Sequence, residues 1–283
     1  MNRYSFSVDT ETIKEAIDWK YGSSGLKGSL DALEELEATD SKIEYNSTRP
    51  EDPADLKPWF RAINAGKKDG GFDIGLQNGV LHNPDYLTSE EGYRNAETRI
   101  SNLEVMDNGQ RLFEPDLLIF RAPEVDEYED LNVVQNIRRA HKAIEEREDL
   151  VGTPSLENMP EQGTRTLLET SSDIDRVERL SSKKDYAMNY VLDVSYPKDL
   201  RRFAERLPAD RVGEVQLSNR KTKPDGVETH LPLYIEDGDY NMTEVMSMIE
   251  DFFPEADLSV EIDPDHLNRR SIENTAEFLD NHL

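Results

Sequence analysis

Four short apolar segments in the C-terminal half of the chain each carry a polar side chain near their end. They are residues 155–159 with Glu157, 190–194 with Asp193, 213–217 with Gln216 and 258–262 with Glu261. Three carboxylates brought to one place repel one another strongly unless they share a proton or a cation. A divalent cation relieves that repulsion, and oxygen ligands suit Mn²⁺ or Mg²⁺. These side chains therefore predict a metal site built from strand ends.

Such side chains meet only if the segments that carry them lie side by side. Eight segments have strand-like sequences: residues 4–8, 42–46, 79–83, 116–120 and the four segments above. Helical periodicity occupies residues 30–36, 53–60, 89–105, 133–146, 174–180, 200–207, 243–253 and 272–279. Strands that recur at intervals of roughly 30 or more residues, with helices between them, are typical of a strand–helix repeat. The alternation predicts an α/β fold, a single (β/α)8 TIM barrel over residues 1–283.

An open doubly wound sheet is the competing arrangement. Such a sheet normally has a glycine-rich phosphate-binding turn directly after its first strand. The residues at that place, Val8–Thr12, contain no glycine, and the glycine-rich stretch Gly22–Gly28 lies too far from the strand. We interpret Gly22–Gly28 as a loop over the barrel mouth. The barrel also explains the polar strand ends, because barrel enzymes place their sites at the C-terminal ends of their strands.

Further polar residues at the ends of predicted strands are candidates for substrate binding. Arg121 and Arg220 come just after the fourth and seventh strands, where a guanidinium could bind a phosphate or carboxylate group. Neutralisation of nearby acids is the alternative role for both arginines. His82, at the end of the third strand, and Asn158, next to Glu157, complete the predicted substrate-binding set.

Several of these segments together resemble the xylose-isomerase-like barrel superfamily, which contains sugar-phosphate isomerases and epimerases and the apurinic-site endonuclease IV. The similar segments are Ser155–Pro160, Leu192–Tyr196, Glu228–Leu233 with Gly238–Tyr240, and Val260–Ile262, and Leu81–Tyr86 looks like the family's third strand. The resemblance covers the C-terminal half well and the N-terminal half loosely. It implies a metal-dependent isomerase or epimerase that acts on a sugar or sugar phosphate.

In the epimerase-type members, as the resemblance implies, a glutamate, an aspartate, a histidine and a glutamate on strands five to eight bind one divalent metal ion. Glu157, Asp193 and Glu261 match the three acids, and the two glutamates would act as acid and base on a carbon next to a carbonyl. Gln216 stands where the histidine is expected, and His230 from the following loop could supply the nitrogen ligand. An amide oxygen is a hard ligand, so Mn²⁺ or Mg²⁺ is favoured, with Zn²⁺ as a further candidate. No organic cofactor is expected.

Two other functions stay open. One is a degenerate barrel without catalysis that binds a ligand, because Gln216, Tyr196 and Arg121 stand where the family has histidines. The other is an endonuclease IV-like nuclease, which would hold three zinc ions with several histidines. The chain has Arg121–Ala122 and Tyr196 at two of those places, which argues against the nuclease.

The charge of the chain limits its partners. Its 283 residues include 60 Asp and Glu against 33 Lys and Arg, a formal net charge of -27 that is spread along the sequence. Such a surface repels itself unless salt screens the charges, so we expect a protein from a salt-accumulating halophile. The same charge argues against a nucleic-acid partner, since no Lys/Arg cluster is present to neutralise phosphates.

The absence of cysteine excludes disulfides, thiolate metal ligands and a cysteine nucleophile. No apolar run approaches the roughly 20 residues of a membrane helix, and residues 1–6 lead into a strand without a signal-peptide profile. We therefore expect a soluble, cytoplasmic protein that binds no membrane and takes a small sugar or polyhydroxy carbonyl substrate. A homo-oligomer is compatible with the sequence.

Overall fold

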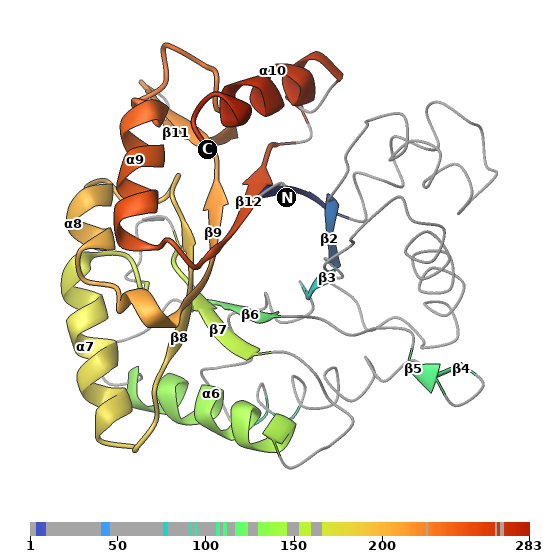
Figure 1. Ribbon diagram of the computed structural model, residues 1–283. Coiled ribbons are helices and arrows are strands. Elements are labelled where there is room, and N and C mark those ends of the chain that lie inside the picture. The colour runs from blue at the N-terminus through green and yellow to red at the C-terminus, as the bar shows by residue number, and fades with distance from the viewer. Residues whose placement is uncertain are drawn as a thin grey trace.

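The computed structural model describes the C-terminal half of the chain almost completely and short parts of the N-terminal half. The described residues are 4–9, 41–45, 76–78, 91, 94, 106–107, 110–111, 117–123, 130–145, 153–159, 166–224, 226–263, 265–266 and 269–283. From Leu117 onward, strands and helices alternate along the chain, apart from a hairpin at residues 219–231 (Figure 1). Within these ranges, no helix has both the length and the apolar character that a membrane crossing requires.

Eight parallel strands form one sheet. In sheet order they are β3 (Leu76–Asn78), β2 (Ser41–Tyr45), β1 (Tyr4–Asp9), β12 (Asp257–Glu261), β9 (Val212–Leu217), β8 (Asn189–Asp193), β7 (Thr153–Glu157) and β6 (Leu117–Arg121). Every pair of neighbours in this order is parallel. The two ends of the order, β3 and β6, lie against each other, so the sheet curves round into a TIM barrel. The predicted fold class is confirmed.

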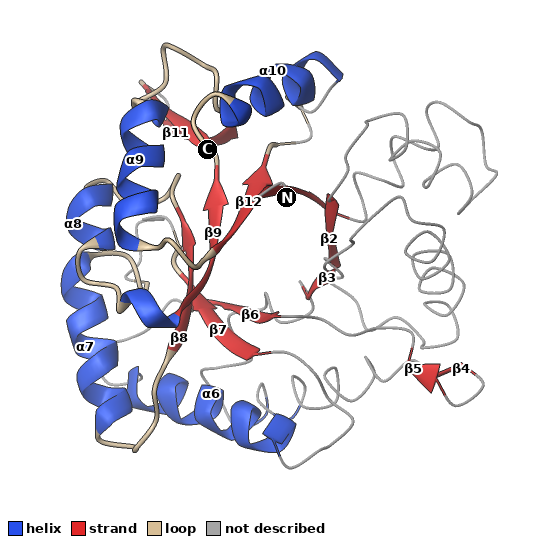
Figure 2. Ribbon diagram, viewed as in Figure 1, coloured by secondary structure: helices blue, strands red, loops and turns tan. Residues whose placement is uncertain are grey.

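Helices follow the strands of the C-terminal half and lie on the outside of the sheet, as Figure 2 shows. They are α6 (Asp130–Glu145), α7 (Ser171–Ser182), α8 (Leu200–Ala204), α9 (Met242–Phe252) and α10 (Arg269–Asp280). A short 3-10 helix, Ala209–Arg211, precedes β9. Parallel neighbours require such crossover connections, because the chain must return to the same end of the sheet before each new strand.

The first turn of α7 illustrates how the local sequence starts a helix. Thr170 precedes the helix, and Asp173 stands three residues later. The carboxylate of Asp173 accepts a hydrogen bond from the main-chain nitrogen of Thr170 at 2.8 Å. This bond satisfies a donor at the start of the helix, and the acid also interacts favourably with the positive end of the helix dipole.

An apolar core fills the space between strands and helices. Side chains alternate between the two faces of a strand. The outward-facing set Leu156, Leu192, Val215 and Val260 belongs to one buried apolar cluster with helix residues such as Ile174 and Val245. The alternate positions point into the barrel: Ser155 and Glu157 on β7, Asp193 on β8, Gln216 on β9, and Ser259 and Glu261 on β12. Packing on the outer face thus stabilises the barrel, and the inward-facing residues at the ends of these strands are polar.

Two antiparallel hairpins depart from the simple strand–helix repeat. One joins β4 (Met106–Asp107) and β5 (Gln110–Arg111). The other joins β10 (Asn219–Lys223) and β11 (Gly226–Leu231) and follows β9 in the chain after a single residue. The sequence predicts a loop around His230, whereas the structure has the strand β11 there. A hairpin can form because its strands pair with each other and need no place in the barrel sheet.

The predicted strands and helices that fall on described residues agree with the observed elements to within a few residues. The third strand is Leu76–Asn78, just before the predicted range 79–83, which lies outside the described residues. Leu76–Asn78 pairs with β2, and the strand predicted at residues 79–83 stays a prediction. Gly22–Gly28, His82 and the helices predicted at 30–36 and 53–60 also lie outside the described residues. Of the helix predicted at 89–105, only Glu91 and Arg94 are described, and both are helical.

Candidate metal centre

Polar side chains converge where the barrel strands end. Arg121, Glu157, Asp193 and Glu261 are the last residues of β6, β7, β8 and β12, and Gln216 is the next to last residue of β9. The parallel register sets Arg121 opposite Glu157 and Asp193 opposite Gln216. Since parallel strands of a barrel all end at the same mouth, side chains at these positions lie at one level.

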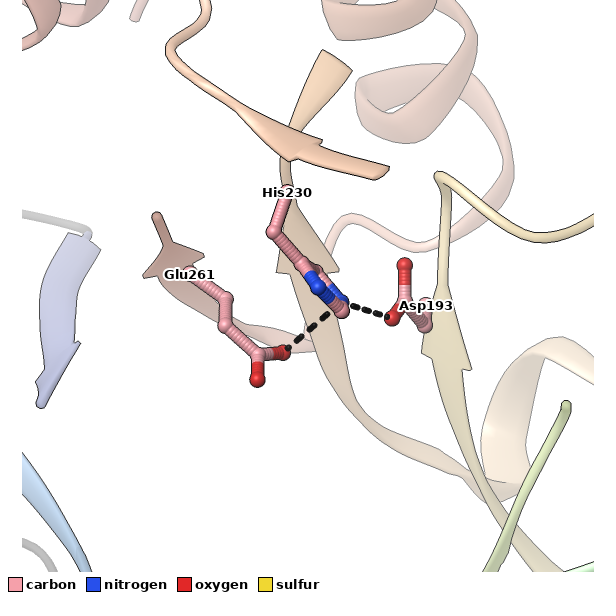
Figure 3. Close-up of side chains that lie close together, drawn as sticks. All are labelled: Asp193, His230 and Glu261. Carbon is pink, nitrogen blue, oxygen red and sulfur yellow. Dashed lines mark hydrogen bonds and ion pairs between the residues drawn. The ribbon is translucent and has the colours of Figure 1, made fainter. Parts of the chain in front are cut away.

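Asp193, His230 and Glu261 form a compact group at this mouth, which we call the triad (Figure 3). One potential ligand atom from each residue lies within 4.8 Å of the other two. Nε2 of His230 is 3.0 Å from Oδ2 of Asp193 and 3.7 Å from Oε2 of Glu261. One imidazole nitrogen and two carboxylate oxygens that face a common point are a donor set suited to a divalent cation.

The carboxylate of Asp193 is held by its neighbours in the chain and across the sheet. Its Oδ1 accepts two hydrogen bonds from Ser195, one from the main-chain nitrogen and one from the hydroxyl, both at 2.8 Å. Asn158 donates from Nδ2 to the main-chain oxygen of Asp193 at 2.9 Å, and its Oδ1 accepts from the main-chain nitrogen of Asp193 at 2.8 Å. Asp193 is fully buried. These bonds therefore orient the residue so that Oδ2 faces His230.

His230 reaches the triad from the hairpin and not from a barrel strand. Its φ of 55° lies in the left-handed region, which histidine adopts more often than most residues. Its main-chain oxygen accepts a hydrogen bond from the main-chain nitrogen of Asp263 at 2.8 Å, which ties β11 to the residue just beyond β12. Burial alone would lower the pKa of His230, but the charge of Glu261 and the hydrogen bond and charge of Asp193 raise it to about 10. Without a cation, the imidazole is therefore protonated between two carboxylates.

Glu157 lies beside the triad in a different environment. Its side chain is buried, and its Oε2 is 3.5 Å from Nε of Arg121. Burial raises the pKa of Glu157 to about 8; the charge of Arg121 opposes this shift, and the charges of Glu261 and Asp193 reinforce it. At neutral pH this carboxyl group therefore carries a proton, which is the form required of a general acid.

Gln216 contributes a buried oxygen to the same region. The residue is 2 % exposed, and its Oε1 has no hydrogen-bond partner within the part of the chain that the structure describes. A buried polar atom without a partner costs about 1–3 kcal/mol, and a cation would satisfy it. The orphaned oxygen and the triad together fit a divalent ion, with the amide as an oxygen ligand in addition to the triad.

The residues predicted to bind substrate take different places. Nη1 of Arg220 donates to the main-chain oxygens of Ser195 at 3.2 Å and Tyr196 at 3.0 Å, so this arginine stabilises the turn after β8. Arg121 lies against Glu157, and both polar atoms of the Asn158 side chain bond to Asp193. His82 lies outside the described residues. Substrate binding by these four residues stays a prediction.

Two residues that the sequence does not single out as site residues belong to the site. Ser195 orients Asp193. The sequence does contain a signal for this role, because the hydroxyl and main-chain nitrogen of a serine two residues after an aspartate can bond to the carboxylate of that aspartate. Tyr196 is 9 % exposed, and its ring packs edge-on against the ring of His230 with centroids 5.5 Å apart. The family pattern marks Tyr196 only as a missing histidine.

No family model matches the sequence, and no curated protein sequence matches it. Solved structures do share its fold. The probable 3-DHS dehydratase AsbF from Bacillus anthracis has a TM-score of 0.63 at 14% sequence identity, with 99% of this chain and 100% of that chain covered. The D-allulose 3-epimerase from Methylomonas sp. has a TM-score of 0.61 at 10% identity, with 100% and 99% covered. A xylose isomerase domain protein from Planctomyces limnophilus has a TM-score of 0.59 at 10% identity, with 98% and 95% covered. At such identities the likeness establishes the fold, a TIM barrel that sugar epimerases share.

Proposed function

We propose that the protein is a metal-dependent isomerase or epimerase of a sugar or a similar polyhydroxy carbonyl compound. The observation that carries the proposal is the triad at the barrel mouth beside the protonated carboxyl group of Glu157. The names of similar structures support it, because a D-allulose 3-epimerase and an L-ribulose 3-epimerase are among them. The likeness itself concerns the fold, so the activity rests on the site residues.

The triad residues Asp193, His230 and Glu261 would hold the ion, with Gln216 as an additional oxygen ligand. Two carboxylates and an amide oxygen favour Mn²⁺ or Mg²⁺ over Zn²⁺. When bound, such an ion stabilises the negative charge that develops on a substrate carbonyl oxygen. Ser195 and Asn158 would keep Asp193 in position for the ion, as partners of metal ligands commonly do.

Glu157 and Glu261 would transfer the protons. They end β7 and β12, which are separated in the sheet by β8 and β9, so their carboxyl groups approach the mouth from different sides. Glu261 would remove the proton from the carbon next to the carbonyl, and Glu157 would return its own proton to the opposite face of that carbon. The product is the epimer, and the two carboxyl groups have exchanged protonation states. The raised pKa of Glu157 keeps its proton available at neutral pH.

Solvent deuterium incorporation tests this chemistry. L-ribulose and D-allulose are incubated in D₂O with the Mn²⁺-loaded protein in molar KCl, and exchange at carbon is followed by NMR. We expect exchange of at least one sugar by the unmodified protein. Glu261→Gln should slow that exchange by about 100-fold or more, because a positioned base contributes 10²–10⁴-fold. Glu277→Gln, a change on the exposed surface of α10, is the matched control and should leave the rate unaltered.

Mn²⁺ titration calorimetry tests the site without relying on catalysis. His230→Ala should weaken binding by more than the roughly 10–100-fold typical of changes outside the ligand shell. His266→Ala is the matched control, since His266 is bonded to Glu228 at 3.2 Å and lies outside the triad. Equal Mn²⁺ affinities of His230→Ala and the unmodified protein would contradict the proposed site.

A ligand-binding barrel without catalysis is the second candidate function. Gln216, in a place where the family resemblance implies an imidazole, favours it, because a neutral amide is a weaker ligand. Metal analysis after loading and dialysis separates the two functions. A stoichiometric ion together with deuterium exchange supports the isomerase or epimerase, whereas a metal-free protein without exchange supports the binding barrel.

A further inference from the structure

Tyr196 follows β8 in a turn whose main chain is held on several sides. The main-chain nitrogen and hydroxyl of Ser195 both bond to Asp193, and Nη1 of Arg220 donates to the main-chain oxygens of Ser195 and Tyr196. The hydroxyl of Tyr240 donates to the main-chain oxygen of Pro197, the residue after Tyr196. The backbone that carries the Tyr196 side chain is therefore fixed independently of that side chain.

The hydroxyl of Tyr196 has no partner within the described parts of the chain, although the side chain is 9 % exposed and lies at the site. Burial raises the pKa of Tyr196 well above its usual value, and the charges of Asp193, Glu157 and Glu261 raise it further, against an opposing effect of Arg121. The hydroxyl thus lies in the field of the whole site. A tyrosine hydroxyl with its ordinary pKa of about 10 is neutral at neutral pH, so it is available as a hydrogen-bond donor.

Packing explains the ring of Tyr196 but not its hydroxyl. The ring meets the ring of His230 edge-on, at an interplanar angle of 74°, and a phenylalanine would make the same contact. The hydroxyl oxygen itself is not completely buried, in contrast to Oε1 of Gln216. A molecule that enters the site from outside the chain can therefore bond to it.

We infer that the Tyr196 hydroxyl donates a hydrogen bond to an oxygen of the substrate, a step that rests on the proposed function. A neutral donor suits this place because three carboxyl groups already surround it. The best acceptor is an oxygen that gains negative charge during the reaction, namely the carbonyl oxygen or the adjacent hydroxyl oxygen of the resulting enediolate. Tyr196 thereby selects compounds in which a carbonyl and a hydroxyl group lie on neighbouring carbons.

Acetohydroxamate is a suitable probe, because it presents two adjacent oxygens with partial negative charge, as an enediolate does. Its Kd is measured by calorimetry on the Mn²⁺-loaded protein in molar KCl, for the unmodified protein, Tyr196→Phe and Tyr186→Phe. We expect Tyr196→Phe to bind acetohydroxamate about 10-fold more weakly or worse, the loss expected for one hydrogen bond to a charged acceptor. The Mn²⁺ affinity and the unfolding midpoint should not change, since the ring contact with His230 is kept. Tyr186→Phe, before β8 at the opposite end of the barrel, should match the unmodified protein.

The outcomes separate this inference from the proposed function. Equal acetohydroxamate affinities of Tyr196→Phe and the unmodified protein, or no acetohydroxamate binding by either, would contradict the inference alone. A parallel loss of Mn²⁺ and acetohydroxamate affinity in Tyr196→Phe would also overturn it, because Tyr196 would then act only by positioning His230. Failure of the unmodified protein to bind Mn²⁺ would contradict the proposed function, and the inference with it.

Discussion

Asn158 joins the ends of β7 and β8, and its replacement tests how the triad is held in place. The side chain is 1 % exposed, and its two polar atoms form a reciprocal pair with the main chain of Asp193 at 2.9 and 2.8 Å. Asn158→Ala removes both bonds at once. It leaves a main-chain donor and a main-chain acceptor of Asp193 without these partners in a buried position.

The expected cost follows from those two bonds. Each buried group left without a partner costs about 1–3 kcal/mol, so Asn158→Ala should lower the free energy of unfolding by about 2–6 kcal/mol. Asn158→Asp keeps the acceptor at Oδ1 but sets a second oxygen against the main-chain oxygen of Asp193 and adds a fourth carboxyl group to the site. This variant should therefore be at least as unstable as the alanine variant.

Guanidinium denaturation in constant molar salt measures both variants. Asn281→Ala is the matched control: its Nδ2 donates to the main-chain oxygen of Glu277 at a similar 2.8 Å, but the residue is exposed. We expect this control to change the free energy of unfolding by less than about 0.5 kcal/mol. A change below about 1 kcal/mol for Asn158→Ala, or an equal cost for the control, would refute the reasoning that buried pairing orients Asp193.

Three further predictions concern the surroundings of the site and the surface. In Gly238→Ala, the new Cβ would lie 2.4 Å from Nδ2 of Asn219, whose side chain bonds to two main-chain oxygens. Thermal unfolding should show a loss of about 1–3 kcal/mol in the free energy of unfolding. An unchanged unfolding midpoint would contradict the close packing of Gly238 against Asn219. Glu178→Gln removes the charge that pairs with Arg211 and that accepts a hydrogen bond from the hydroxyl of Tyr190. Denaturant unfolding should therefore show a loss of roughly 2 kcal/mol in the free energy of unfolding. Asp175→Asn, which breaks an exposed ion pair, is the control and should show no such loss. Raising KCl from 0.1 to 2 M should increase Tm by more than about 4 °C by screening the excess of acids, and a flat or falling Tm would count against a halophilic surface.

The barrel itself could be predicted from the sequence because its strands and helices bury different patterns of side chains. In β7, Leu156 stands between the polar residues Ser155 and Glu157, and β8 is a short apolar run that ends in Asp193, while α9 repeats apolar residues at helical spacing. These local patterns are strong in the C-terminal half. They do not reveal which segments pair at each position, for example that β3 pairs with β2.

The candidate site could be predicted only in part. Asp193 and Glu261 follow from their places at strand ends, and His230 follows from the family resemblance. The hairpin that carries His230, the pairing of Asn158 with Asp193, and the place of Tyr196 against His230 do not follow from any local pattern. The last two depend on contacts between residues that are more than 30 positions apart, whereas the hairpin pairs residues at most 12 positions apart and places His230 through its fold onto the barrel mouth.

By itself, the sequence determined which side chains stand at the ends of the strands, because alternation and strand–helix spacing are local properties of the chain. Only the tertiary structure decided the protonation states of those side chains. Glu157 and Glu261 are the same residue type at equivalent strand ends. Burial gives Glu157 a pKa of about 8 beside Arg121, whereas Glu261 faces an imidazole. The protonation state of a carboxyl group depends on its solvation and on the charges around it, and the folded chain sets both.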